Sequence, residues 1–376
     1  MNHSTGFPTS AGFPTSAGKS HSCSTFLLRD ENSFLIGHNL DDTGGIPLPG
    51  VICVNKRGVR KRNISFHEIL TGEKPPSPTI HWTSRYGSVT FNSWGKEFTD
   101  GGINEAGLYV QEMSLGETVY PQDDALPRMF MEQWMHYLLD NYETVAQVLE
   151  TMSQIIIDGW PWHYFLCDRT GHTAGIQFID GQPNVYTGES MPVPVFCNSL
   201  YPQEMENLSN YAGFGGQTPV DLDDMKVERF VHAAHLIQNA PESPSVDYAF
   251  AILKNLERGD DESGTFTLWS YVIDVMEQRV YWHTKAAQER KFFDVRAFDF
   301  SCDTPAMMLD INIPKSGDMG ATFEPYSPEL NRSVVKAGIG AIDGAEEYVQ
   351  ERGGTLENMI NAVADFPAST ECVEQT

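Results

Sequence analysis

Cys23 is the residue of this sequence whose type and position best suit covalent chemistry. It follows a polar stretch punctuated by proline and glycine, and it opens the strand-like segment CSTFLL. If the peptide bond before it were cut, its new α-amino group, with a pKa of about 7.7 to 8.0, would serve as the base for its own thiol. One residue would then act as both nucleophile and base on an amide carbonyl. Taken alone, a cysteine after a leader is more often incidental or buried.

Five stretches of sequence read together give Cys23 its significance. They are CSTFLLRDENSFLIGHNLDD from position 23, YGSVTF, GGINEAGLYVQEMSL, CNSLY and VERF. The set resembles the N-terminal-nucleophile cysteine amidases of the choloylglycine hydrolase superfamily, which includes conjugated bile salt hydrolases and penicillin V acylases. The resemblance covers most of residues 23 to 285. The C-S/T-x-F opening, the G-x-N-x-D block ending at Asp41 and the N-E-x-G-L block at 104 to 108 are specific in combination.

The resemblance implies a role for each of four residues. Cys23 matches the nucleophile, which autoproteolysis of the Ser22–Cys23 bond exposes. Asp41 matches an aspartate that hydrogen-bonds the nucleophile's amino group, and a carboxylate there would favour the charged amine. Asn198 in CNSLY matches a donor to the oxyanion, and Arg229 in VERF matches an arginine whose charge favours the thiolate. Without the resemblance, Asn198 is a turn residue after a strand and Arg229 a helix-surface arginine.

Two positions depart from the best-known members of the superfamily. Where bile salt hydrolases have arginine in the G-R-N-x-D block, this chain has His38, so a permanent cation becomes a titratable imidazole. The second oxyanion position, ten residues after Asn104, is Ser114 where bile salt hydrolases have asparagine. If His38 lies in the pocket, activity should change as it titrates, and if not, it is structural. Both departures leave the reaction type intact and put a bile salt substrate in doubt.

The function that follows is hydrolysis of the C–N bond of a small-molecule N-acyl amide, through an acyl-enzyme on Cys23. No cofactor and no metal is expected. The net charge and His38 favour a neutral or modestly polar leaving group on an apolar acyl part, as in penicillin V, N-acyl amines or N-acyl homoserine lactones, over a bile salt. The aromatic residues between Trp160 and Tyr164 are more often core, although in a cleft they would suit such an acyl group. An acyltransferase of similar fold and a non-catalytic binding protein remain as alternatives.

The elements that must position these residues alternate in blocks. Strand signals such as STFLL, SFLIG and VICVN come first, then helical stretches at about 127–152, 223–238 and 249–256, with further strands between and after them. This order predicts an α+β fold with mainly antiparallel sheets. The resemblance implies a four-layer αββα sandwich of the N-terminal-nucleophile hydrolases, with Cys23 opening a central strand. We expect a leader or pro-peptide at 1–22, one amidohydrolase domain at 23–370 and a frayed polar tail at 371–376.

The leader repeats the hexad GFPTSA at 6–11 and 12–17 and has neither a basic start nor an apolar core of signal-peptide type. As written, the sequence therefore reads as cytoplasmic, or as periplasmic or secreted if the start is mis-assigned. No run of 18 apolar residues occurs anywhere, which argues against a transmembrane helix.

The charge balance bears on the partners of the protein. Lys and Arg number 25 and Asp and Glu 51 in 376 residues, which leaves a net charge of −26. Such a field repels nucleic acids and anionic membranes, so neither is an expected partner. Related enzymes are often homotetramers, and a homo-oligomer is compatible with the resemblance.

Six cysteines are few for this length, and none forms a C-x-x-C pair or a metal-type spacing with histidine. We therefore predict no disulfide framework and no metal site. Cys53, Cys167 and Cys197 lie in apolar runs, where a small buried hydrophobic residue is the expected role.

Overall fold

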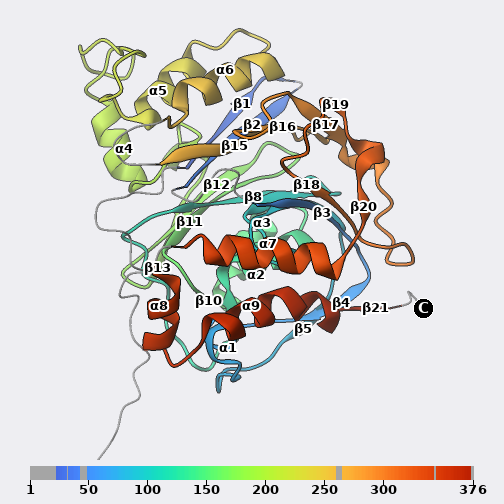
Figure 1. Cartoon of the computed structure of the whole chain (residues 1–376). Coiled ribbons are helices and arrows are strands. Elements are labelled where there is room, and N and C mark those ends of the chain that lie inside the picture. Colours follow the sequence, from blue (N-terminus) through green and yellow to red (C-terminus); the bar gives the residue numbers. More distant parts are fainter. Residues whose placement is uncertain (1–22, 32, 43–48, 260–264, 343, 374–376) are drawn as a thin grey trace, which may run out of the picture.

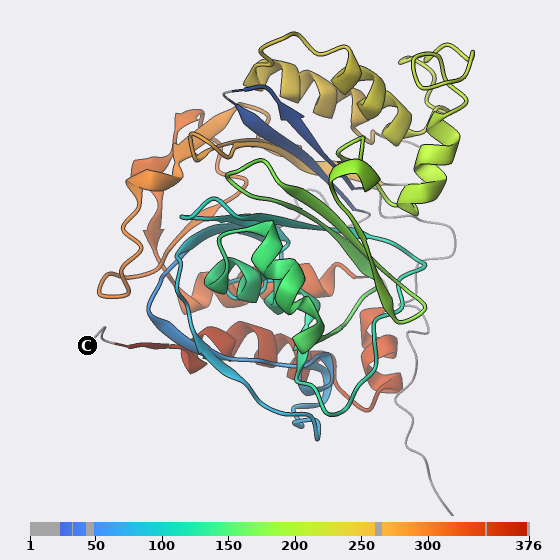
Figure 2. The ribbon, with the colours of Figure 1, turned by 180° about the vertical axis from the view of Figure 1, so that it is seen from behind.

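Two large sheets stacked face to face make up the centre of the molecule, and helices cover both outer sides (Figures 1 and 2). The structure is a computed structural model that describes residues 23–373 except residues 32, 43–48, 260–264 and 343. The expected α+β, four-layer αββα sandwich is confirmed. In both large sheets the strand pairs are antiparallel, apart from the short parallel pair β17–β19.

The first sheet carries Cys23, and we call it the nucleophile sheet. Its strand order is β14-β1-β2-β15-β16-β17-β19. The strands span Ser24–Arg29 (β1), Phe34–Asp42 (β2), Val195–Phe196 (β14), Phe266–Asp274 (β15), Arg279–Thr284 (β16), Lys291–Asp294 (β17) and Gly317–Asp318 (β19). β1 lies between the two-residue strand β14 and β2, so Cys23 opens a strand next to the sheet edge, whereas a central strand was expected.

The second sheet faces the nucleophile sheet and has the order β13-β12-β11-β8-β7-β6-β3-β18-β20. Its strands span Val51–Asn55 (β3), Ser88–Asn92 (β6), Gly101–Asn104 (β7), Tyr109–Ser114 (β8), Trp162–Cys167 (β11), Thr173–Ile179 (β12), Gln182–Tyr186 (β13), Met307–Asp310 (β18) and Glu324–Pro325 (β20). Two small sheets lie beside it. One pairs β9 (Arg128–Phe130) with β10 (Ile156–Asp158), and the other joins β4 (Val59–Arg62), β5 (His81–Thr83) and β21 (Glu371–Cys372).

The helices divide between the two outer faces. On the nucleophile sheet lie α4 (Tyr201–Leu208), α5 (Arg229–Gln238) and α6 (Val246–Leu256). On the other side lie α1 (Phe66–Thr71), α2 (Met131–Asn141), α3 (Val145–Thr151), α7 (Pro328–Gly340), α8 (Ala345–Glu351) and α9 (Leu356–Asp365). We call the second sheet the outer sheet. One apolar core fills the space between the two sheets and under α5 and α6, and a second core lies between the outer sheet and α2, α7 and α9. Cys23 belongs to the first core.

The helix expected over 127–152 is interrupted. β9 occupies its start, and α2 ends before Tyr142, whose backbone is extended with φ −122° and ψ 151°. α3 then begins anew with a capping box, in which the Thr144 side chain accepts from the Gln147 backbone and Gln147 reaches back to the N-cap. The helix expected over 223–238 begins only at Arg229, and the third helix begins earlier than expected, at Val246.

A disulfide joins Cys302 to Cys372, so the prediction of a chain without disulfides is wrong for this pair. Residues 371 and 372, expected in a frayed tail, form β21 and pair with β4. Val373 N–H donates to Gly58 O at 2.8 Å, and Cys302 Sγ lies 3.5 Å from the same oxygen. The two cysteines thus reach a Cα–Cα distance of 5.5 Å, which suits a disulfide, through pairing between segments far apart in the sequence. Cys53, Cys167 and Cys197 are free and buried, as expected.

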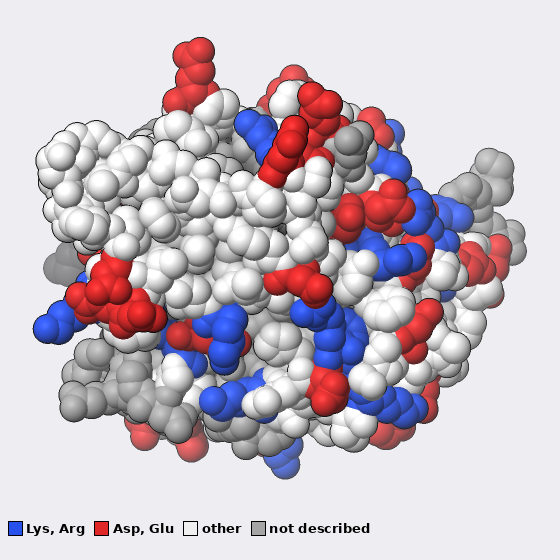
Figure 3. All heavy atoms as spheres, turned by 90° about the horizontal axis from the view of Figure 1, so that it is seen from above, with Lys and Arg blue, Asp and Glu red and all other residues white. Residues whose placement is uncertain are grey.

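The surface over α5 and α6 shows how the charge is distributed (Figure 3). Acidic and basic side chains lie interspersed on this face, and a broad uncharged area adjoins them. The acidic excess is therefore not gathered into one patch on this face. None of the helices in the described ranges combines the length and the apolar character that a membrane span requires.

Candidate active site

Cys23 lies directly before β1 and is 3% exposed. Its Sγ is 3.8 Å from the backbone oxygen of Asp41 on the neighbouring strand. Burial raises the pKa of the thiol well above its usual value, and the nearby carboxyl groups of Glu112 and Asp41 raise it further, while Arg229 opposes them. In the full-length chain the nitrogen of Cys23 is also a peptide amide, because Ser22 precedes it. The thiol of the uncut chain is therefore protonated and has no amine base.

Asp41 lies near the end of β2, where its side chain is buried and held on both oxygens. Oδ2 forms an ion pair with Arg229 Nη1 at 3.0 Å, and Oδ1 accepts from Thr267 Oγ1 at 2.5 Å. Burial raises the pKa of this carboxyl to about 7, against the opposing effects of Arg229 and Thr267. The carboxyl therefore changes charge in the range in which most enzymes work.

Arg229, the first residue of α5, connects Asp41 to Asn198. Its Nη2 donates to Asn198 Oδ1 at 3.1 Å while its Nη1 binds Asp41. Because Arg229 binds the amide oxygen, the orientation of the Asn198 amide is fixed. Asn198 Nδ2 donates one N–H to Ser114 O at 2.8 Å, and an amide nitrogen has two such hydrogens. The structure thus brings Cys23, Asp41, Arg229 and Asn198 together, as expected from the sequence.

Ser114 contributes its backbone. The carbonyl oxygen of Ser114 accepts from Asn198, whereas strand alternation turns its side chain away from the space between the sheets. On β8, Tyr109 and Met113 belong to the core that contains Cys23, while Val110 belongs to the core on the other side of the sheet. Ser114 therefore holds the Asn198 amide through its carbonyl, and its hydroxyl lies on the side of the sheet away from Cys23.

His38 is not a pocket residue. It is fully buried on β2, where its Nδ1 lies 2.8 Å from Thr25 Oγ1 and its ring centroid 5.0 Å from that of Tyr271. Burial lowers the pKa of the imidazole to about 3, so it is neutral at physiological pH. Of the two alternatives that the sequence left open for His38, a titrating pocket group or a structural residue, the burial and contacts favour the structural one, with the side chain packed in the space between the sheets.

Thr267 is a site residue that sequence reasoning missed. Its hydroxyl binds Asp41 and accepts from the backbone N–H of Arg258 at 2.8 Å. A register shift between Thr267 and Trp269 interrupts the pairing of β15 with β2 and leaves Thr267 opposite Asp41. No local motif marks this threonine, since it is 226 residues away from its partner in the sequence.

The aromatic residues from Trp160 to Tyr164 divide between two environments. Tyr164 and His163 are fully buried, whereas Trp160 and Trp162 are half-buried at the edge of the outer core. Trp160 packs against Trp94 with ring centroids 5.1 Å apart. The larger part of this cluster is core, as the sequence favoured.

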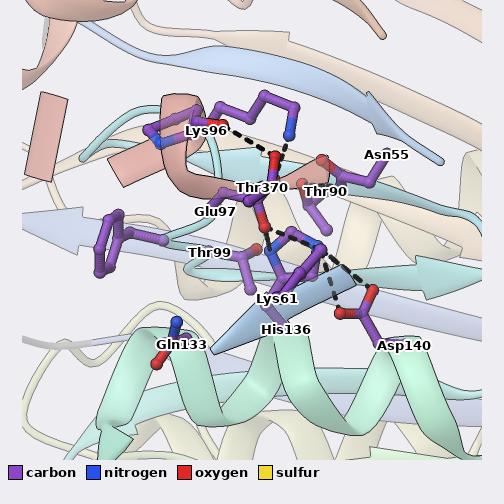
Figure 4. Close-up of polar contacts among 12 residues, drawn as sticks. Asn55, Lys61, Thr90, Lys96, Glu97, Thr99, Gln133, His136, Asp140 and Thr370 are labelled. Carbon is purple, nitrogen blue, oxygen red and sulfur yellow. Dashed lines mark hydrogen bonds and ion pairs between the residues drawn. The ribbon is translucent and has the colours of Figure 1, made fainter. Parts of the chain in front are cut away.

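A second polar cluster lies between α2 and β4, on the helical side of the outer sheet (Figure 4). Lys61 Nζ contacts Glu97 Oε2 at 2.7 Å, Asp140 Oδ2 at 3.0 Å and His136 Nε2 at 3.0 Å, and Lys96 also pairs with Glu97. Burial alone would raise the pKa of Glu97, but the neighbouring cations Lys61 and Lys96 hold it well below its usual value. Opposite charges are matched within this buried cluster, which connects β4, α2 and the loop that carries Lys96 and Glu97.

One group of potential metal ligands occurs among the described residues, made up of Cys302, Asp303 and Cys372 within 4.8 Å. Because the two sulfur atoms are bonded to each other, they cannot act as thiolate ligands in this state.

Comparisons with known proteins agree with this geometry. A model of the linear amide C–N hydrolases, choloylglycine hydrolase family, matches residues 23–308, so the match begins at Cys23. The penicillin V acylase of Pectobacterium atrosepticum is 23% identical over 296 residues, which are 66% of this chain and 78% of that protein. The solved penicillin V acylase of Agrobacterium tumefaciens gives a TM-score of 0.69 at 23% identity and covers 81% of this chain and 98% of its own.

A mutant of the conjugated bile acid hydrolase from Clostridium perfringens gives a TM-score of 0.62 at 16% identity, with coverage of 78% of this chain and 98% of that one. At such identities the solved structures establish the shared fold. The family match covers more than half of the chain and includes every residue of the network around Cys23.

Proposed function

Because the chain belongs to the choloylglycine hydrolase family of linear amide C–N hydrolases, we propose that it hydrolyses an N-acyl amide with Cys23 as an N-terminal nucleophile. The observation that carries this proposal is the continuous set of contacts that links Cys23 to Asp41, Asp41 to Arg229 and Arg229 to Asn198. These contacts support the proposal because they connect a thiol, a carboxyl group, a cation and an amide donor, which are the kinds of group that acyl transfer uses.

Activation begins with the bond before Cys23. The thiol attacks the carbonyl carbon of Ser22, the acyl group moves from nitrogen to sulfur, and the α-amino group of Cys23 is released. Water then hydrolyses the thioester, which leaves Ser22 as a free carboxylate and restores the thiol. The nucleophile thereby gains the amine that lies within reach of its own sulfur, and Asp41 next to it favours the charged form of that amine.

Catalysis repeats the chemistry on the substrate. The amine takes the thiol proton, the thiolate attacks the amide carbonyl, and the negative oxygen that forms is stabilised by the second N–H of Asn198. The tetrahedral intermediate then expels the amine part of the substrate, which takes the proton held by the α-amino group of Cys23. Water hydrolyses the acyl-enzyme to the free acid. Arg229 favours the thiolate and holds the amide of Asn198 in place, so loss of its charge affects both steps.

For the substrate we propose an apolar acyl group on a small amine, with the neutral amine part of an N-acyl homoserine lactone preferred over that of penicillin V, which carries a carboxylate. A net charge of −26 disfavours approach of the anionic glycine or taurine part of a bile salt. The position of His38 supports this choice, because this chain has a buried neutral imidazole where bile salt hydrolases have an arginine.

The test compares glycocholate, penicillin V and N-acyl homoserine lactones of graded chain length by kcat/KM, with processed enzyme and a thiol reductant. We expect glycocholate to be the poorest substrate. If glycocholate is best, local cations such as Arg229 outweigh the global field and the charge argument is wrong. If an added amine captures the acyl group in preference to water, the protein is an acyltransferase, and if processed protein turns over no amide, it is a binding protein.

We also propose that the protein works in an oxidising compartment, whereas the sequence reads as cytoplasmic. The Cys302–Cys372 disulfide supports this, since structural disulfides persist mainly outside the cytosol. Fractionation of the source cells, followed by mass analysis of alkylated protein, tests both the location and the state of the two thiols.

A further inference from the structure

Two buried side chains of the outer sheet hydrogen-bond to the segment that carries Asn198. They are His163 on β11 and Gln177 on β12, both fully buried and in contact with the backbone of residues 197–201. His163 Nε2 is 2.7 Å from Cys197 O, and Gln177 Nε2 is 3.1 Å from Ser199 O. These two contacts hold the backbone on each side of Asn198.

The hydrogen-bond directions in this pair follow from one backbone group. Tyr201 N–H donates to Gln177 Oε1 at 3.2 Å, so the amide nitrogen of Gln177 must lie on the other side. That nitrogen donates to Ser199 O and, at 2.9 Å, to His163 Nδ1. Nδ1 of His163 is therefore an acceptor, and the single proton of the neutral ring lies on Nε2, from which it donates to Cys197 O.

This arrangement needs a neutral imidazole. Burial lowers the pKa of His163 to about 4, so the ring is neutral near pH 7. Each side chain satisfies its buried polar atoms only in this one orientation. The pair therefore fixes three backbone groups, at Cys197, Ser199 and Tyr201, within five consecutive residues.

We propose that His163 and Gln177 are positioning residues that hold the backbone around Asn198, so that its second amide N–H meets the oxyanion. Ser114 O and Arg229 already hold the side chain of Asn198. Only the position of the Asn198 backbone must still be fixed by other contacts. An oxyanion donor must lie about 2.7 to 3.1 Å from the developing charge, and a small displacement removes most of its effect. The inference rests on the role proposed above for Asn198.

A double-mutant cycle with penicillin V as substrate, or the best substrate of the panel if that is another amide, tests the proposal. Gln177→Met removes the amide at similar size, and Asn198→Ala removes the donor. Gln177→Glu provides a second variant, since it keeps an acceptor for Tyr201 N–H but cannot donate to both Ser199 O and His163. Tyr164→Phe is the matched control. Tyr164 is next to His163 on β11 and is equally buried, and the substitution removes a hydroxyl group that lies 3.0 Å from the Tyr120 hydroxyl. Rates refer to protein whose N-terminal Cys23 is counted by intact mass.

We expect Asn198→Ala to lower kcat by about 10² to 10³-fold, as loss of an oxyanion donor does elsewhere. Gln177→Met should lower kcat by about tenfold with KM changed by less than about twofold, and Tyr164→Phe should leave both within about twofold. In the Asn198→Ala background, Gln177→Met should have no further effect on kcat, because the donor that it positions is gone.

If Gln177→Met, or Gln177→Glu where the first variant does not fold, lowers kcat by the same factor in both backgrounds, the pair acts independently of Asn198 and the inference is wrong. That result would leave the hydrolase proposal intact. If Asn198→Ala alone leaves kcat unchanged, the proposed role of Asn198 is wrong, and the positioning role falls with it.

Discussion

Removal of the Cys302–Cys372 disulfide should destabilise the protein strongly and leave its catalytic network unchanged. The bond closes a loop with a sequence separation of 70 residues. For a loop of this length, the chain-entropy relation gives about 4.4 kcal/mol of stabilisation through restriction of the unfolded chain. With an unfolding entropy of about 2.1 cal/mol/K per residue, a chain of about 350 residues should lose about 6 °C in Tm.

The assay compares wild-type protein with the Cys302→Ser/Cys372→Ser double variant by differential scanning calorimetry, each with and without reductant. Cys372 is exposed and Cys302 half-buried, so reductant reaches the bond. Reductant should lower the Tm of the wild type by about 6 °C and leave that of the double variant unchanged. Activity at 25 °C, assayed with reductant to keep Cys23 as a thiol, should be equal in the wild type and the double variant, because among the described residues no hydrogen bond or ion pair joins either cysteine to the network around Cys23. A wild-type Tm that does not change, with both thiols shown by mass to be reduced, would mean that the disulfide does not stabilise the protein by restricting the unfolded chain.

Three further predictions concern the site. Because the folded pKa of Asp41 is raised to about 7, its ionisation costs stability as the pH rises from its unfolded value of about 4. The Tm of the uncut Cys23→Ala protein should therefore fall between about pH 4 and 7, and the fall should be smaller in Cys23→Ala/Asp41→Asn. An identical fall in these two proteins would contradict this. His38→Gln should leave the pH profile of kcat/KM unchanged between about pH 5 and 8, since the histidine is neutral throughout; a lost acidic limb would place it in the pocket. Thr267→Val should lower kcat about tenfold by freeing one oxygen of Asp41, whereas Thr267→Ser keeps the hydroxyl and should stay near wild type; equal losses would point to packing instead.

The site residues that the sequence revealed lie in short local patterns. Cys23, Asp41, Asn198 and Arg229 each occur in a recognisable block, and the structure joins them in one network. The blocks could be recognised because each depends on residues within a few positions of one another. How the blocks meet in space depends on strand pairing, which the blocks do not contain.

Strand pairing explains why the sequence left the place of His38 open and did not reveal Thr267. The sequence shows that His38 and Asp41 point to opposite sides of a strand, and β2 indeed runs through both. It does not show which side faces the second sheet, so the burial of His38 could not be derived. Thr267 faces Asp41 only because of the register shift in β15, a feature that no residue pattern in that strand indicates.

The remaining differences have separate causes. The break between α2 and α3 could have been predicted, since Thr144 and Gln147 form a capping box with its usual spacing. The Cys302–Cys372 pair could not, because it depends on β21 pairing with β4 from the other end of the chain. Cysteine number and spacing carry no information about such contacts.

In the mechanism proposed above, Cys23 becomes the N-terminal nucleophile by cutting the chain before itself. Intact mass and N-terminal sequencing of purified wild-type protein and of Cys23→Ala test it most directly. We predict that the wild type lacks residues 1–22, begins at Cys23 and hydrolyses the amide, while Cys23→Ala keeps its full length and is inactive. A Cys23→Ala protein cut at the same bond, or a wild type that is active with residues 1–22 still attached, would contradict the claim.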